Sequence, residues 1–80
     1  MHFDNKAIGR VIRRHRTDKG WTQEVFSGFA AIARSHLSMI ETGVKQPNIE
    51  TLWRIAEVLE LRPSQLIAEI EEEIQSSDPS

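Results

Sequence analysis

Apolar residues recur every three or four positions along most of the chain, the spacing of helices with one buried face, and no segment shows the alternation of a β-strand. A first helix is predicted over residues 5–19, ended by Gly20. Within it, Gly9 costs about 1 kcal/mol relative to alanine, so we expect Gly9 to let a neighbouring helix approach closely. The predicted inner stripe consists of Ile8, Val11, Ile12 and His15.

A second, shorter helix is predicted from its N-cap, Thr22, to about Ala30. Trp21 and Phe26 stand at the two positions of a hydrophobic staple, in which residues flanking the start of a helix pack together. The expected buried side holds Val25 or Phe26, together with Phe29.

A turn at Ala31 and Ile32 leads to a third helix, predicted from about Ala33 to Thr42 and ended by Gly43. Its inward residues are spaced i and i+3, at Leu37 and Ile40. Two short helices joined by a tight turn are typical of the helix-turn-helix, whose second helix enters the DNA major groove. The polar face of the third helix carries Arg34, Ser35, His36, Ser38 and Met39.

The rest of the chain predicts two more helices. Asn48 caps the first, which runs to Glu60, and Pro63 suits the first turn of the second. The chain is therefore expected to form an all-α fold of five helices, as a single domain over residues 1–74 with a flexible tail at 75–80. The apolar stripes of the last two helices are Ile49, Leu52, Ile55, Ala56 and Leu59, flanked by Trp53 and Val58, and then Leu66, Ile67, Ile70 and Ile74.

Charge divides the chain into unlike halves. Residues 1–48 hold eight Lys or Arg and four Asp or Glu, a net +4, whereas residues 49–80 hold two and eight, a net −6. This asymmetry favours one face directed at phosphates and another kept away from them, although scattered surface charge is the alternative. Four acids near the C-terminus surround a helix axis instead of converging, which favours a solvated, DNA-repelling face over an acid–base or metal site; they are Glu69, Glu71, Glu72 and Glu73.

Several classes of protein are disfavoured by what the composition lacks. Without cysteine there is neither a disulfide nor a thiolate metal site. The three histidines, His2, His15 and His36, lack the spacing of metal ligands, so no metal is expected. His15 is instead interpreted as a residue at the edge of the core. A nucleophile–base pair and a phosphate-cradling glycine loop are absent, so neither an enzyme nor a cofactor is expected. No apolar run approaches the roughly 20 residues of a membrane span, and no signal peptide is visible. A cytoplasmic protein without a membrane partner is the expectation.

Three segments, KGWTQEVF, RSHLSMIETG and PNIETLWRIAEVL, occur in this order within residues 5–70. Together they resemble the phage-repressor-like Xre family of helix-turn-helix regulators, and the small size and short apolar last helix are most similar to restriction–modification controller proteins. Small phage repressors and antitoxins share the pattern. The chain departs from the family at Ala31, where glycine is frequent, and at Ala33, where Ser or Thr commonly caps the recognition helix. The turn thus either avoids left-handed geometry or tolerates strain.

The resemblance implies roles for residues outside the polar face. Gln23 matches a phosphate-contacting glutamine, and Arg16 and Glu41 match positions that form an ion pair between the first and third helices. Arg16 is also free to approach a phosphate. Three residues just past the recognition helix are similarly placed for the DNA backbone: Thr42, Lys45 and Gln46.

The polar face offers chemistry suited to base edges. Arg34 can donate two hydrogen bonds to guanine O6 and N7, or act as a phosphate clamp or surface residue. Ser35 and Ser38 can donate to bases or phosphates, or be solvated. His36 can reach bases or backbone, and Met39 can pack on a thymine methyl or at the edge of the core.

One helix in one groove reads only a few base pairs, whereas a two-fold dimer reads two half-sites one DNA turn apart. The expected dimer interface is Ile67, Ile70, Ile74 and Trp53, because a small monomer has little left to cover this stripe; folding back onto the monomer's own core is the alternative. The predicted function is a dimeric, sequence-specific transcriptional regulator acting on a near-palindromic operator, and the resemblance implies a restriction–modification controller protein. Its partners would be double-stranded DNA and a second copy, with no small-molecule ligand. The other hypothesis is an antitoxin that binds a toxin and regulates its own operon.

Overall fold

The computed structural model describes residues 2–77, which form five helices and no strand. The helices are α1 (Asn5–Asp18), α2 (Gln23–Ala30), α3 (Arg34–Thr42), α4 (Ile49–Val58) and α5 (Pro63–Ser77). The predicted all-α, five-helix architecture is confirmed. Two predicted ends were wrong: α4 stops two residues before Glu60, and α5 continues through Gln75 to Ser77, into the segment expected to be a flexible tail. Residues 78–80 of that tail lie outside the described part.

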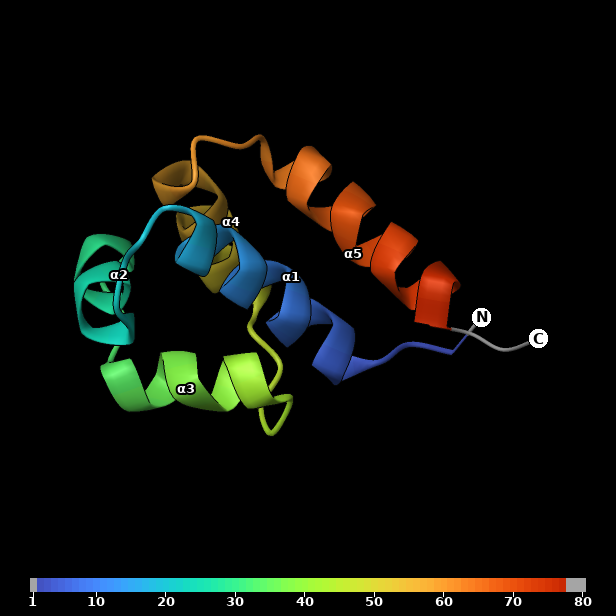
Figure 1. Ribbon diagram of the computed structural model, residues 1–80, viewed down its shortest axis with the longest axis horizontal. Coiled ribbons are helices and arrows are strands. Elements are labelled where there is room, and N and C mark those ends of the chain that lie inside the picture. Colours follow the sequence, from blue (N-terminus) through green and yellow to red (C-terminus); the bar gives the residue numbers. More distant parts are fainter. Residues whose placement is uncertain (1, 78–80) are drawn as a thin grey trace.

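The helices pack around α1, which lies between α3 and α5 (Figure 1). Helix α2 sits at one end of the molecule and packs on α3 and α4, while the last turn of α5 lies at the other end (Figure 1). Within residues 2–77, no helix combines the length and the apolar character that crossing a membrane requires.

Side chains cap three of the helices, two of them at the predicted caps Thr22 and Asn48 and the first at Asp4, which the sequence analysis did not identify. Asp4 Oδ1 accepts from Lys6 N at 2.9 Å, Thr22 Oγ1 accepts from Val25 N at 3.2 Å, and Asn48 Oδ1 accepts from Thr51 N at 2.8 Å. These bonds satisfy amide groups that a helix leaves unpaired in its first turn. Helix α3 lacks such a bond, because its N-cap is Ala33.

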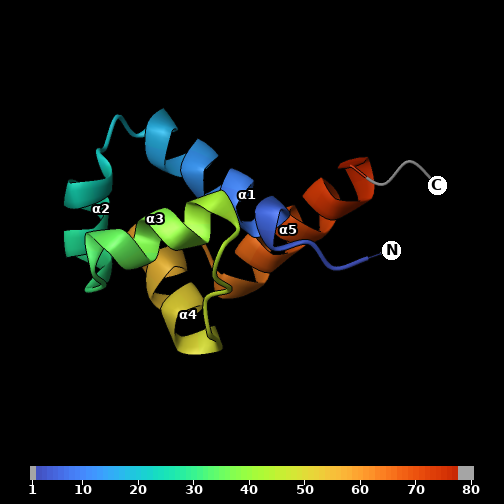
Figure 2. The same ribbon diagram turned by 90° about the horizontal axis from the view of Figure 1, so that it is seen from below.

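The core is formed mainly by the predicted stripes, with two corrections. Phe26 is fully buried, whereas Phe29, also expected inside, is 60% exposed. The buried side of α2 is centred on Phe26 and Ala30, so Phe29 falls on its outer side, where its ring packs edge-on against Trp21 with 5.2 Å between centroids. Ile49 is 67% exposed because the first turn of α4 projects beyond the other helices (Figure 2).

Gly9 permits the close approach of a neighbouring helix that the sequence predicted, and that helix is α3. A Cβ atom at this position would lie 2.3 Å from the carbonyl oxygen of Glu41 and 2.6 Å from that of Ile40. These distances are far inside van der Waals contact, so only glycine allows the two helices to approach this closely. The register between α1 and α3 therefore depends on Gly9.

Helix α5 is held against α1 by apolar contacts and by ion pairs. Ile70 and Ile74 are 6% and 7% exposed, so the expectation that a small monomer leaves them uncovered was wrong. Glu73 accepts from Arg10 Nε at 2.7 Å and from Arg14 NH2 at 2.8 Å. The four acids are thus not one solvated face, because Glu73 pairs with α1 and Glu69 does so as well. Glu69 lies 2.7 Å from Nε2 of the half-buried His15, which is a core-edge residue as expected.

The turn between α2 and α3 places Ala31 in the left-handed region, with φ 57° and ψ 43°. This turn therefore tolerates strain instead of avoiding left-handed geometry. The αL conformation costs an L-residue roughly 1–2 kcal/mol, and glycine escapes this cost at an entropic penalty of roughly 0.5–1 kcal/mol.

We expect Ala31→Gly to stabilise the domain by about 0.5–1 kcal/mol, measured as the free energy of unfolding in urea. The control is Ala68→Gly at an exposed position within α5. There glycine should destabilise by about 1 kcal/mol. Destabilisation by both substitutions would show that the turn gains nothing from glycine.

Candidate nucleic-acid interface

Helices α2 and α3 form a helix-turn-helix whose turn is closed by backbone hydrogen bonds. Ile32 N donates to Ser27 O at 3.0 Å, and Ala31 N donates to Gly28 O at 3.3 Å. The predicted staple is present, with 5.9 Å between the ring centroids of Trp21 and Phe26. The turn bonds set the angle at which α3 leaves α2, and the staple fixes the direction in which the chain enters α2.

Helix α3 is anchored on one side and uncovered on the other. Leu37 and Ile40 are fully buried and Glu41 is 8% exposed. The outer side of α3 lies along an edge of the molecule, with none of the other described helices beyond it (Figure 1). The residues predicted to contact bases all fall on α3, with Arg34 and Ser35 exposed and with His36, Ser38 and Met39 half-buried.

A buried ion pair fastens α3 to α1. Arg16 Nε donates to Glu41 Oε2 at 2.7 Å and Arg16 NH2 donates to Glu41 Oε1 at 2.9 Å, with the two side chains 11% and 2% exposed. Such a two-bond arrangement is the strong geometry for an arginine–carboxylate pair. The hydrogen bonds to Glu41 raise the pKa of Arg16, while burial opposes the shift. The ion pair that the family resemblance implies is therefore present.

A further bond of Arg16 bears on its expected contact with a phosphate. Its NH1 atom donates to the carbonyl oxygen of Trp21 at 2.9 Å, so all three guanidinium nitrogens have acceptors inside the protein. A guanidinium has five N–H donors and these bonds use three of them, so one N–H on each of NH1 and NH2 has no acceptor in the protein among these bonds. Arg16 therefore ties α1 to α3, and its contact with a phosphate stays a prediction.

An open depression joins the start of α2 to the start of α3. Thr22, Gln23, Glu24 and Arg34 line it together with Arg16. The fold thereby brings Gln23, the expected phosphate contact, close to Arg34, the expected base contact. Gln23 Nε2 also donates to Glu41 Oε1 at 3.0 Å, a bond that the sequence analysis missed because no local pattern reports a contact between residues 18 positions apart.

The other expected phosphate contacts gather at the opposite end of α3 and in the loop after it. Thr42 is exposed, and its hydroxyl donates to Ser38 O at 3.0 Å within its own helix. Lys45 and Gln46 are exposed in the loop after Gly43. Polar groups thus flank both ends of α3, as a helix lying in the major groove would require.

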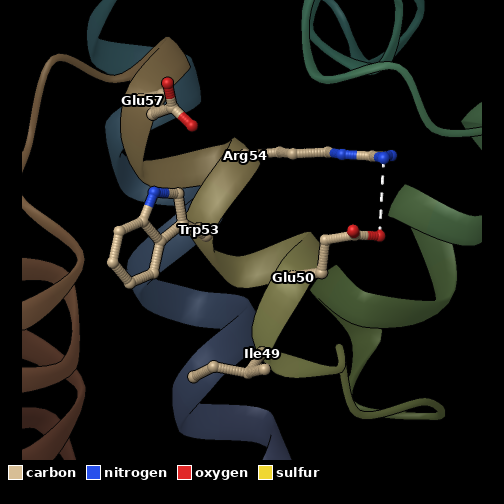
Figure 3. A pocket seen from close by; sticks show the side chains of 5 residues that line it. All are labelled: Ile49, Glu50, Trp53, Arg54 and Glu57. Atoms are coloured by element: carbon tan, nitrogen blue, oxygen red, sulfur yellow. Dashed lines mark ion pairs between the residues drawn. The ribbon is translucent and has the colours of Figure 1, made fainter.

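A separate apolar surface lies on α4 and α5 and takes in Phe3, which precedes α1, and sequence reasoning identified only part of it. It consists of Phe3, Ile49, Trp53 and Ile67, which are 62%, 67%, 54% and 44% exposed. A groove connects Phe3, Ile49 and Ile67. Figure 3 shows Ile49 and Trp53 extending to one side of α4 and the Glu50–Arg54 ion pair to the other. We call these four residues the α4–α5 apolar surface.

Comparison with known proteins connects this geometry to a family. Residues 12–66 match the helix-turn-helix family. The chain is 30% identical to the HTH-type transcriptional regulator y4dJ of Sinorhizobium fredii over 67 residues, which cover 84% of this chain and 87% of the relative.

Two solved structures of restriction–modification controller proteins are similar to this fold. Wild-type C.Esp1396I matches with a TM-score of 0.81 and 26% identity over 95% of this chain and 99% of that one. C.AhdI from Aeromonas hydrophila matches with a TM-score of 0.74 and 26% identity over 78% of this chain and 94% of that one. With α2 and α3 in helix-turn-helix geometry and the family match spanning most of the chain, the protein belongs to the Xre-like helix-turn-helix family of DNA-binding transcriptional regulators.

Proposed function

We propose that this regulator binds a near-palindromic operator as a homodimer, with α3 of each protomer in the major groove. The observation that carries this proposal is the uncovered outer side of α3, which presents Arg34 and Ser35 from a helix that buried contacts hold rigid. Similarity to two restriction–modification controller proteins over most of the chain supports control of restriction–modification genes as the biological role.

Arg34 is the residue that we expect to read a base most selectively. It is exposed in the first turn of α3 and borders the same depression as Gln23. An arginine that bonds guanine through O6 and N7 contributes roughly 1–3 kcal/mol of discrimination between bases. Ser35, His36, Ser38 and Met39 would complete the contact with base edges.

Contacts with phosphates would fix how α3 lies on the duplex. Gln23 would make such a contact at the start of α2, Thr42 in the last turn of α3, and Lys45 and Gln46 in the loop that follows. Such contacts set register and orientation but carry no sequence information directly.

The operator is found first, by mapping the DNA that the protein protects upstream of its own gene. On that duplex we expect Arg34→Ala to weaken binding by a factor of about 5–150, equivalent to about 1–3 kcal/mol. Arg34→Lys retains the charge but cannot form the two-bond contact, so it should recover little of the selectivity. The readout is the Kd for the operator and for a version with the contacted guanine replaced.

Arg62→Ala is the matched control, because Arg62 is exposed in the loop between α4 and α5, and it should leave the Kd nearly unchanged. If Arg34→Ala weakens binding to both duplexes equally, Arg34 is a phosphate contact and not a base reader.

The α4–α5 apolar surface is the proposed dimer interface. Trp53 and Ile67 were expected there and are exposed, whereas Ile70 and Ile74 are already covered by their own protomer. Phe3 and Ile49 extend the surface along one groove. An exposed apolar surface of this kind marks an interaction site on a small protein.

We expect Ile67→Glu to weaken dimerisation at least about tenfold, because burying an Ile side chain contributes about 1.5–3 kcal/mol and a two-fold interface loses two copies at once. Sedimentation at several concentrations measures the effect. Val25→Glu on α2 is the control, since Val25 is 42% exposed against 44% for Ile67 but lies outside the surface. Equal dimerisation of the wild type and the Ile67 variant would exclude this interface.

A further inference from the structure

The side chain of Gln23 is bonded to the buried ion pair beneath it. Its Nε2 lies 3.0 Å from Glu41 Oε1, and both oxygens of Glu41 also accept from Arg16. The Glu41 side chain is 2% exposed, whereas Gln23 is half-buried and lines the depression between the starts of α2 and α3. Gln23 thus links the protein interior to the surface on which DNA is proposed to bind.

The chemistry of the carboxylate determines which way round the amide is held. An ionised carboxylate only accepts hydrogen bonds, so the nitrogen of Gln23, and not its oxygen, must face Glu41. One hydrogen of that nitrogen bonds Glu41 and the second stays available. Rotation of the amide would break a bond to a charged group, which is stronger than a neutral one.

The charge of Glu41 does not disqualify this arrangement near DNA. Arg16 bonds both carboxylate oxygens at 2.7 and 2.9 Å. The net charge of the pair is therefore close to zero for a group that approaches through the depression. A phosphate, which also only accepts, would therefore meet the second N–H of Gln23 without a bare carboxylate behind it.

We propose that Glu41 is a positioning residue for DNA binding, which holds the Gln23 amide in the orientation that donates to a phosphate. This inference rests on the proposed function, because it assumes that Gln23 faces the DNA backbone. Holding the amide before DNA arrives removes part of the ordering cost of the contact. The buried pair then has two roles, joining α1 to α3 and orienting a phosphate contact.

The test is a double-mutant cycle on affinity for the mapped operator duplex at fixed salt. Gln23→Met removes the amide and keeps the length of the side chain, and we expect it to weaken binding about tenfold in the wild-type background. In the Glu41→Gln background, which loses the charged acceptor, the same substitution should weaken binding about twofold or less. Gln46→Met is the control, because Gln46 lies beyond α3 and should have the same effect in both backgrounds.

An additive cycle, with Gln23→Met equally costly in both backgrounds, would overturn the role of Glu41 while leaving the proposed function intact. Failure of the wild type to prefer its operator over unrelated DNA would instead contradict the proposed function.

A second measurement applies even when the Glu41 variant does not fold. We expect ¹⁵N relaxation of the side-chain amides in the free wild-type protein to show Gln23 as ordered as its backbone and Gln46 as mobile. A mobile Gln23 amide would overturn the proposal.

Discussion

Glu41→Ala is expected to destabilise the domain by about 3–5 kcal/mol, because it leaves Arg16 charged and buried without its partner. Arg16 has no other carboxylate within ion-pair distance among the described residues. The same substitution removes the acceptor of the Gln23 amide. For a domain of 80 residues, such a loss is a large part of the total stability. Urea unfolding monitored by circular dichroism measures it.

Two controls separate this effect from a general loss of charge. Glu41→Gln keeps the shape of the side chain and should cost less than Glu41→Ala, since its amide oxygen still accepts from Arg16. Glu50→Ala breaks an exposed pair, Glu50 with Arg54 at 3.4 Å, and should change stability by less than about 0.5 kcal/mol. If neither Glu41 variant changes the free energy of unfolding, the buried pair does not have the structural role assigned to it.

Gly9→Ala is the second substitution with a large expected effect. We expect it to destabilise the domain, whereas replacing glycine by alanine within a helix usually stabilises it. In most helix interiors this change stabilises by about 1 kcal/mol. Here the new Cβ would overlap backbone atoms of Glu41 and Ile40 at 2.3 and 2.6 Å. Backbone atoms cannot rotate away, so α1 and α3 must separate, and we expect a loss of about 3 kcal/mol or more in the free energy of unfolding.

Gly28→Ala provides the matched comparison. Gly28 lies in α2, and a Cβ there would meet nothing within 4 Å. This variant should be more stable than the wild type by about 1 kcal/mol. If both glycine variants stabilise the protein, the close approach of α1 and α3 does not limit what residue 9 can be.

Much of the candidate site could be predicted because it lies within a continuous stretch of sequence. The staple of Trp21 and Phe26, the Thr22 cap and the inward Leu37 and Ile40 all depend on spacings of three to five residues. Local periodicity reports such relations directly. The ion pair between Arg16 and Glu41 is different, since only the resemblance to a family indicated that residues 25 positions apart would meet.

The errors came from contacts between helices. Phe29 and Ile49 follow the apolar periodicity of their helices, yet both are exposed because neither faces another helix. Ile74 was expected to be left over for a partner, yet α1 covers it. Glu73 was expected in solvent, yet it pairs with two arginines of α1. In each case the sequence pattern indicated whether a face of a helix was apolar or charged, but not which other helix, if any, packs against that face.

Residue spacing and motifs were enough to predict where the five helices begin, which family the chain resembles and which helix presents a polar outer face. These properties depend on residues close together along the chain, whose backbone preferences and side-chain spacing act locally. Packing between helices was needed to establish that α3 is the helix whose backbone meets Gly9, that Glu41 bonds Gln23 as well as Arg16, and that Ile70 and Ile74 belong to the protomer's own core. Those outcomes depend on how whole helices pack, and the distances that result are not encoded in the spacing within any single helix.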